Sequence, residues 1–157
     1  MNKLTVALMV AAFALLASCG LQKADIEAEK AAVKAVLDQY VTSVENEDMD
    51  AYAQLVAHDS EMMNFGGFGD PIVGWDALKQ VMDGQNTALS ETEISVSNLA
   101  IHVSEMGDLA WATCLWNLKA IMGENPIELP IRCTWVLEKR DTKWLIVHFH
   151  KSMAQGS

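Results

Sequence analysis

Apolar residues recur at helical spacing in the first part of the chain. Between residues 25 and 46 they lie three or four positions apart, with charged residues between them, a pattern that predicts an amphipathic helix. A second, shorter helix is expected over 49–57, where Asp48 can cap the first turn. The glycine-rich run 61–74 predicts a short hairpin, and a third helix is expected over 75–89.

From residue 93 onward the pattern changes to long alternating segments. Strands are expected over 93–104, 109–122, 127–140 and 143–151, with short turns between them. Long strands joined by short turns form an antiparallel meander. Because the helices come first and the strands last, we predict an α+β fold in which three N-terminal helices pack on one face of a curved antiparallel sheet.

The alternation also predicts which side chains face the helices, because neighbours in a strand point to opposite sides of the sheet. The even-numbered positions of strand 109–122 and the odd-numbered positions of strand 127–140 are apolar, so both sets are expected to point inward. The same rule makes the odd-numbered positions of strand 143–151 inward and the even-numbered ones outward. A β-bulge would reverse this assignment partway along a strand.

The outer face of the sheet is expected to carry several large apolar groups. Such a face is seldom left bare in a soluble protein, so we expect a homodimer that packs sheet against sheet. An apolar surface without a partner is the alternative. The residues assigned to this dimer face are Trp111, Trp144, Ile146, His148 and His150.

The first residues of the chain predict export. Residues 4–16 form an uncharged apolar stretch that is too short for a comfortable membrane span. The run LASC that ends at Cys19 resembles a bacterial lipobox, which implies cleavage before Cys19 and lipidation of that cysteine. An ordinary secretory signal is the alternative. Gly20 next to the cysteine resembles the pattern that sorts lipoproteins to the outer membrane.

These observations divide the chain into three parts. We expect a lipoprotein signal peptide over 1–18, a tether over 19–24 and one domain over 25–152. The lipid would anchor the domain in the bacterial cell envelope, on the periplasmic side of the outer membrane.

The charge balance excludes one class of partner. The chain has 21 Asp and Glu residues against 11 Lys and Arg residues. Nucleic-acid binding needs a basic face, so no nucleic-acid partner is expected.

His148 and His150 lie two positions apart and therefore on one face of the last strand. A third metal ligand is missing, because His102 is expected three strands away, and no metal or cofactor is predicted. As a general base the pair would have to reach a substrate on the opposite face. We interpret these histidines as hydrogen-bonded groups at a packed face.

At the level of the whole domain, residues 25–152 resemble the nuclear transport factor 2-like, or SnoaL-like, superfamily. The last strand with its turn, RDTKWLIVHFHKS, carries the resemblance most specifically, and the runs ENEDMDAY and NFGGFGDPIVGWDAL support it. The resemblance implies a cone-shaped barrel with a pocket between sheet and helices, and dimers or larger rings. It does not imply one activity, because the superfamily includes isomerases, dehydratases, cyclases, scaffolds and binding proteins.

Within this superfamily the chain is most similar to the association domain of calcium/calmodulin-dependent kinase II. Arginines line the pocket of that domain, and the matching positions here are Trp116, Trp135 and Lys151. The resemblance therefore implies an aromatic pocket with one cation near its rim. Tyr40, Asn64 and Phe65 are expected to complete the ligand pocket around Trp116, Trp135 and Lys151.

Three functions remain open at this point. The first is the binding of an unknown small, partly apolar molecule between the indoles of Trp116 and Trp135. The second is an isomerase or dehydratase that uses an acidic residue in the pocket. The inward strand positions hold no such residue, so Asp59 or Glu61 would have to reach the mouth of the pocket. The third is an assembly module in which the tryptophans fill the core. No catalytic residue is assigned.

Cys114 and Cys133 are both expected to point inward on paired strands. A turn at GENP would place Cys114 opposite Trp135, which makes the two cysteines a diagonal pair about 7–8 Å apart and favours free thiols. A register change of two residues would instead set them face to face.

Overall fold

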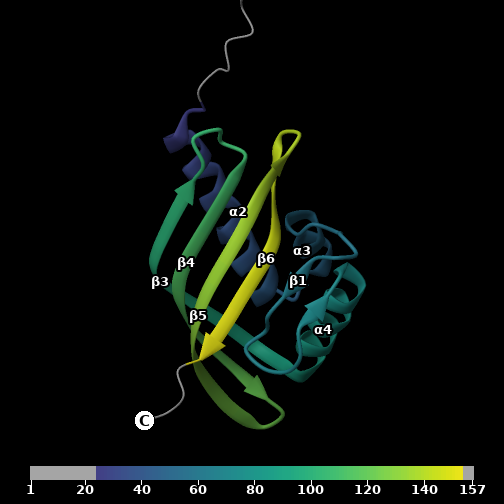
Figure 1. Cartoon of the computed structure of the whole chain (residues 1–157). Helices are drawn as coiled ribbons and strands as arrows, with labels where there is room; N and C mark the ends of the chain where they lie inside the picture. The colour runs from purple at the N-terminus through teal and green to yellow at the C-terminus, as the bar shows by residue number, and fades with distance from the viewer. Residues whose placement is uncertain (1–23, 154–157) are drawn as a thin grey trace, which may run out of the picture.

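Three helices cover one face of a four-stranded antiparallel sheet (Figure 1). The structure, a computed structural model, describes residues 24–153, so the predicted signal peptide and Cys19 lie outside the described residues. The expected α+β fold is confirmed. The helices are α2 (Ile26–Glu45), α3 (Met49–Leu55) and α4 (Trp75–Ala88). The strands of the sheet are β3 (Leu89–Val103), β4 (Leu109–Met122), β5 (Asn125–Arg140) and β6 (Lys143–Met153), and the small hairpin consists of β1 (Met63–Asn64) and β2 (Ile72–Val73).

The ends of the helices follow from their capping residues. The Asp25 carboxylate accepts a hydrogen bond from the backbone N–H of Ala28 at the start of α2. Asp48 caps α3 in the same way, as its sequence position predicts. α4 starts after Gly74, whose φ of 80° favours glycine. A Cβ at this position would lie 2.8 Å from the carbonyl oxygen of Ser60, so the close approach also requires glycine.

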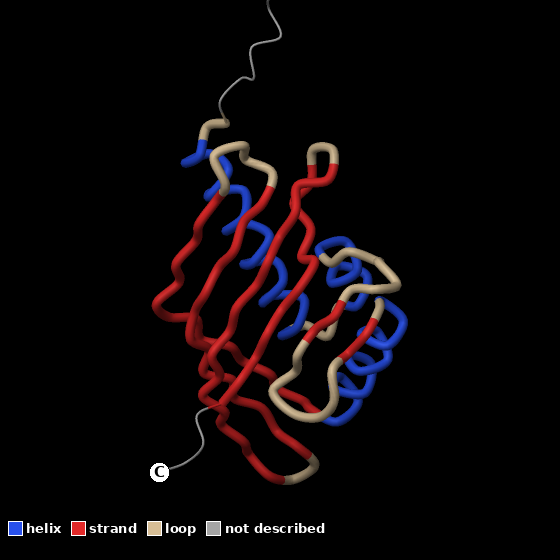
Figure 2. Tube along the Cα trace, in the orientation of Figure 1, coloured by secondary structure: helices blue, strands red, loops and turns tan. Residues whose placement is uncertain are grey.

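The sheet is bent because β3 contains two irregularities. Its pairing with β4 shifts between Ser90 and Glu93 and again between Ser97 and Ala100. Glu91 and Asn98, one in each shift, have positive φ values of 53° and 54°, as expected where extra residues turn a strand. In Figure 1, β3 leaves the end of α4, sweeps across the lower part of the view and then turns along the edge of the sheet; Figure 2 shows the same bend in the Cα trace.

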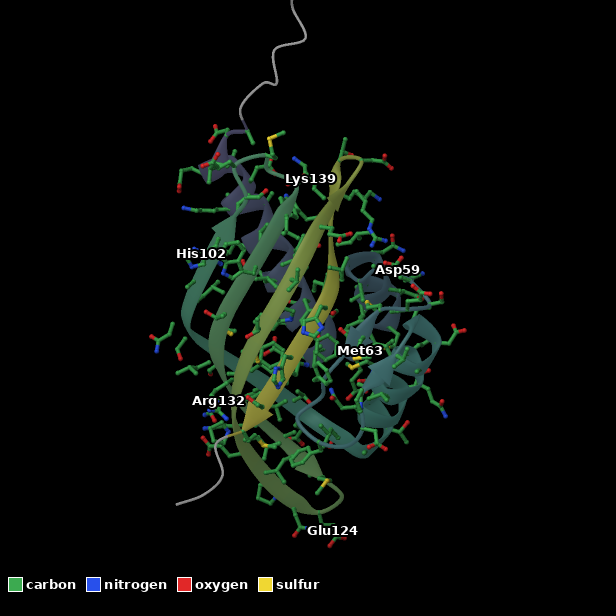
Figure 3. All side chains as sticks on the ribbon, in the orientation of Figure 1. Asp59, Met63, His102, Glu124, Arg132 and Lys139 are labelled. Atoms are coloured by element: carbon green, nitrogen blue, oxygen red, sulfur yellow. The ribbon has the colours of Figure 1, made fainter. Side chains whose placement is uncertain are left out.

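The hairpin between β4 and β5 is tighter than the sequence suggested. Met122 pairs with Asn125, which leaves only Gly123 and Glu124 in the turn, with Gly123 at a φ of 66°. Figure 3 labels Glu124 at the tip of this hairpin. The expected turn at GENP was wrong, because Pro126 is accommodated inside β5, in a stretch that β4 flanks and β6 does not reach. The register moves by two residues, and Cys114 pairs with Cys133.

A β-bulge in β6 corrects two assignments to the dimer face. Val136 pairs with His148 but Leu137 pairs with Ile146, so Val147 is the extra residue. The bulge reverses the alternation, as such an insertion does. Trp144 and Ile146 are only 5% and 0% exposed and belong to the core. Their predicted outward orientation was therefore wrong. After the bulge, Phe149 and the residues that follow it face the sides of the sheet that the sequence predicts.

Trp144 has a specific place inside the fold. Its indole Nε1 donates a hydrogen bond to Glu29 of α2 at 2.8 Å, and the ammonium of Lys139 pairs with the other oxygen of the same carboxylate. These two contacts lower the pKa of Glu29, with the bond from Lys139 contributing most. Through their contacts with Glu29, Trp144 and Lys139 connect the β5–β6 hairpin to α2.

The open edge of β6 is covered by the segment that leads into the small hairpin. The backbone N–H of Phe65 donates to Phe149, and the N–H of Lys151 donates to Phe65, each at 2.9 Å. Ala57 makes a similar bond to Ile146. A covered edge does not offer free pairing positions to other chains. The same contacts hold the loop between β1 and β2 beside the end of β6.

No helix within residues 24–153 combines the length and apolar character needed to span a membrane.

Candidate functional site

Four aromatic side chains form a cluster at the centre of the domain. Tyr40 of α2 lies 5.1 Å from Tyr52 of α3, 6.1 Å from Trp135 of β5 and 6.2 Å from Trp116 of β4, measured between ring centroids. All four rings are buried. The hydroxyl groups of Tyr40 and Tyr52 are 3.4 Å apart and share a hydrogen bond. Burial raises the pKa of both tyrosines, so both remain phenols at neutral pH.

Lys151 places an amine against this cluster. Its Nζ lies 4.7 Å from the ring centroid of Trp116, 5.0 Å from that of Phe149 and 5.4 Å from that of Tyr40. Nζ also donates to the Tyr40 hydroxyl at 3.3 Å. None of the ion pairs within the described residues includes Lys151. Burial lowers the pKa of Lys151, because the charged form loses water without gaining a carboxylate partner.

Two cavities meet at Lys151. One, of about 530 Å³, lies between α4 and the loop that joins β1 to β2, and the other, of about 280 Å³, lies between the end of α4 and the sheet. Trp116 lines the second cavity, and four residues line both: Gly67, Phe68, Gln85 and Lys151. The remaining walls of the second cavity are largely aliphatic, with Val44, Leu118, Ile127, Leu129 and Ile131 among them. The arrangement suits a ligand with an apolar body.

The structure brings together only part of the predicted pocket. Trp116 and Lys151 lie in the cavity walls. Tyr40 is not a wall residue, but its hydroxyl accepts the hydrogen bond from Lys151. Trp135 lies beneath Tyr40 and Trp116 in the core and is not a wall residue of either cavity. Asn64 is buried and its side-chain oxygen accepts a hydrogen bond from the backbone of Phe149, which is a structural role.

Phe65 lies away from the cavities. Its ring packs edgewise against His148 and His150, at centroid distances of 5.7 and 5.4 Å. His148 Nδ1 is also 2.6 Å from the carbonyl oxygen of Met63. Among residues 24–153 no group of three or more potential metal ligands comes together. The two histidines thus connect the outer side of β6 to the small hairpin.

Sequence reasoning missed Gln85, which lines both cavities. The helical spacing of α4 offered a signal, because residue 85 follows the buried Met82 by three positions and so lies near the same face. Gly67 and Phe68 were missed for another reason. Their glycine-rich run was interpreted only as a source of turns, whereas it also forms a cavity wall.

The predicted acid candidates do not enter these cavities. The Asp59 carboxylate accepts two hydrogen bonds from the guanidinium of Arg140, which lower its pKa. Figure 3 shows Asp59 beside α3, and neither Asp59 nor Glu61 is a wall residue of the two cavities. Asp70 is the one carboxylate among those wall residues, and it is exposed in the β1–β2 loop.

The family model of the SnoaL-like domain matches residues 33–156. The chain belongs to the SnoaL-like domain family. A comparison with curated protein sequences gives no match.

Solved structures share the fold of this SnoaL-like domain at low sequence identity. A nuclear transport factor 2-like superfamily protein from Salmonella enterica serovar Typhimurium is 23% identical with a TM-score of 0.75, and the match covers 83% of this chain and 94% of that one. The CaMKII hub of S. rosetta is 24% identical with a TM-score of 0.67, over 83% and 98% of the two chains. A ketosteroid isomerase-like protein from Erwinia carotovora is 16% identical with a TM-score of 0.68, over 82% and 98%.

The outer face of this SnoaL-like domain carries exposed apolar groups on β4. Trp111 is 45% exposed and Leu115 is 43% exposed. Trp111 stacks on His102 of β3, with ring centroids 5.0 Å apart; Figure 3 labels His102 at this edge of the sheet. The exposed apolar strip is narrower than the sequence predicted, because Trp144 and Ile146 face the core.

Proposed function

We propose that this SnoaL-like domain binds a small, partly apolar molecule in the two cavities that meet at Lys151. The observation that carries the proposal is the position of the Lys151 amine, which lies against the ring of Trp116 where an aliphatic cavity opens. Cavities of about 280 and 530 Å³ have the size of small-molecule sites. A flat apolar ligand would stack on Trp116 and keep its polar end near Lys151.

Binding explains the cavity walls better than the two rival functions. An isomerase or dehydratase of the expected kind needs an acid in the cavity, and Asp70, the one carboxylate among the described wall residues, is exposed. A pure assembly module would be favoured by tryptophans that plug the pocket. Trp135 fills the core, as that function predicts, but Trp116 lines the second cavity, where space remains beside its ring.

The test is a titration with 2-naphthalenemethanol, a flat apolar alcohol, followed by tryptophan fluorescence. Gln85→Phe fills the region shared by both cavities, so we expect it to weaken binding at least about tenfold, a loss of about 1.4 kcal/mol. Gln39→Phe makes the same change at an exposed position of α2 and serves as the matched control. Equal binding by both variants and the wild type would contradict the proposal, as would the absence of binding by the wild type.

We propose further that the protein is exported, lipidated at Cys19 and dimeric. The lipobox-like run that ends at Cys19 supports the lipid anchor. The exposed Trp111 and Leu115 on the outer face of the sheet support a dimer that covers them.

A further inference from the structure

The surroundings of Lys151 differ from those of an ordinary structural lysine. The titratable groups around its amine are the phenols of Tyr40 and Tyr52, from α2 and α3, and the thiols of Cys114 and Cys133, from β4 and β5. The other neighbours are the aromatic rings of Trp116 and Phe149. No carboxylate from any of these elements pairs with the amine in the described part of the chain.

Such surroundings disfavour the ammonium and lower the pKa of Lys151, so more of the amine is unprotonated at neutral pH than in an exposed lysine. A buried ammonium without a counterion is costly, and the rings and one hydroxyl compensate only part of the loss of water. The unprotonated amine carries a lone pair and is therefore a nucleophile. An apolar pocket is one of the environments that activate a lysine in this way.

We propose that Lys151 forms a reversible imine with an aldehyde or ketone that binds in the two cavities. This inference rests on the proposed function, because the carbonyl compound must first enter the cavity beside Trp116. Lys151 is a wall residue of both cavities, and its Nζ lies 4.7 Å from the ring of Trp116, which lines the second one; the imine requires the carbonyl carbon of a bound ligand to reach Nζ beside that ring.

The chemistry needs no redox partner. Nζ attacks the carbonyl carbon, and a proton moves from nitrogen to oxygen to give a carbinolamine. The carbon–oxygen bond then breaks, the oxygen leaves as water with both protons that the amine has lost, and a carbon–nitrogen double bond remains. Tyr40, whose hydroxyl lies 3.3 Å from Nζ, stands where it can donate a proton to the leaving hydroxyl and recover one from the nitrogen.

The rival interpretation is that the ammonium stays charged and anchors an anion. An anionic ligand would restore the missing counterion and hold the amine protonated. The two interpretations predict different ligands. An imine requires a carbonyl group, whereas an anion site prefers a carboxylate over a neutral alcohol of the same shape.

The experiment exposes the purified full-length protein at pH 7 to 2-naphthaldehyde and sodium cyanoborohydride, the hydride donor that reduces an imine to a stable amine. Mass spectrometry then follows the addition of naphthylmethyl groups, and peptide mapping assigns them. We expect Lys151 to be labelled about tenfold faster than exposed lysines, because its lowered pKa leaves more of the amine unprotonated at pH 7. Lys151→Met and Lys151→Arg should lose this fast labelling. Lys143→Met, which changes an exposed lysine of β6, should retain it.

A role for Tyr40 has its own readout. Tyr40→Phe keeps the ring and the packing but removes the hydroxyl, so we expect slower labelling with unchanged affinity for 2-naphthalenemethanol. A purely structural role of the hydroxyl would leave the labelling rate of the folded variant unaltered.

Parallel titrations with 2-naphthalenemethanol and 2-naphthoate separate the possible failures. If the alcohol binds but Lys151 is labelled no faster than exposed lysines, the imine proposal is overturned and the binding function stands. Preference for naphthoate over the alcohol, without fast labelling, would identify an anion site instead. If neither compound nor the aldehyde binds, the proposed function fails and the imine proposal fails with it.

Discussion

Cys114 and Cys133 lie directly opposite each other on β4 and β5, and both are buried free thiols. The pKa of the Cys133 thiol is raised, mainly by its hydrogen bond with Cys114 and secondly by burial. The Cα atoms of directly paired residues in antiparallel strands are about 4.5–5.5 Å apart, within the range of a disulfide. The tight turn at Gly123 and Glu124 creates this pairing, which the expected register did not contain.

The first prediction concerns these thiols. Oxidation of the folded protein with diamide should join Cys114 to Cys133 within one chain, because little backbone movement is needed. Alkylation after denaturation, read by mass spectrometry, should then find neither cysteine free, and dithiothreitol should reverse the change. Cys114→Ser should leave Cys133 open to alkylation. Persistent free thiols in the oxidised wild type would show that the strands hold the two sulfur atoms apart.

The second prediction is that Lys151→Met stabilises the domain. Methionine fills a similar volume without the cost of burying a charge, so the free energy of unfolding at pH 7 should rise by about 1 to 2 kcal/mol in urea titrations. Lys143→Met, at an exposed position, should change it by no more than about 0.5 kcal/mol. A loss of stability in Lys151→Met would mean that the cation–π contacts outweigh the cost of burial.

The same variant gives a pH dependence with a definite sign. The pKa of Lys151 is lower in the folded chain than in the unfolded chain, so the folded wild type is penalised at every pH at which Lys151 is protonated in the unfolded chain. The penalty is complete below the folded-state pKa and disappears as the pH rises toward the unfolded-state value of about 10.4. The stability advantage of Lys151→Met should therefore shrink as the pH is raised above neutral. A constant advantage would contradict this account.

The third prediction concerns the outer face. If the exposed strip on β4 is a dimer interface, Trp111→Glu should weaken self-association by about 2 kcal/mol, roughly thirtyfold in Kd. Analytical ultracentrifugation measures the change. Met106→Glu, at an exposed position in the β3–β4 turn, is the control and should remain dimeric. A wild-type protein that sediments as a monomer at every concentration would remove the basis for the dimer.

The fourth prediction tests the lipid anchor. Cys19→Ala removes the only sulfur that the lipobox-like run offers for acylation, so we expect the variant to leave the membrane fraction while the wild type stays in it. Fractionation and immunoblotting of the producing cells follow the change. Membrane retention of Cys19→Ala equal to that of the wild type would rule out this anchor.

The sequence predicted the fold well because its periodic patterns are long. The helix cap at Asp48 and the inward sets of β4 and β5 follow from local chemistry and alternation. The bulge at Val147 was not predictable in the same way. The residues from Trp144 to Val147 are apolar at both odd- and even-numbered positions, so the sequence pattern alone did not show where the alternation of inward and outward side chains reverses.

The candidate site was only partly predictable for a related reason. The orientation of Trp116 and Lys151 was predicted correctly because the alternation of side chains holds at both positions. Gln85, Gly67 and Phe68 reach the cavities through the packing of α4 and the β1–β2 loop on the sheet, which is a tertiary arrangement without a periodic signal. Asn64 and Phe65 were misplaced because the path of that loop along β6 determines which way they point.

The central claim, that these cavities hold a small molecule, is tested most directly by native mass spectrometry of the protein purified from the organism that produces it. The wild type and Gln39→Phe should retain a non-peptide mass that denaturation releases, and Gln85→Phe should lose it because phenylalanine occupies the space beside Lys151. Equal retention by Gln85→Phe, or an empty wild type, would contradict the account.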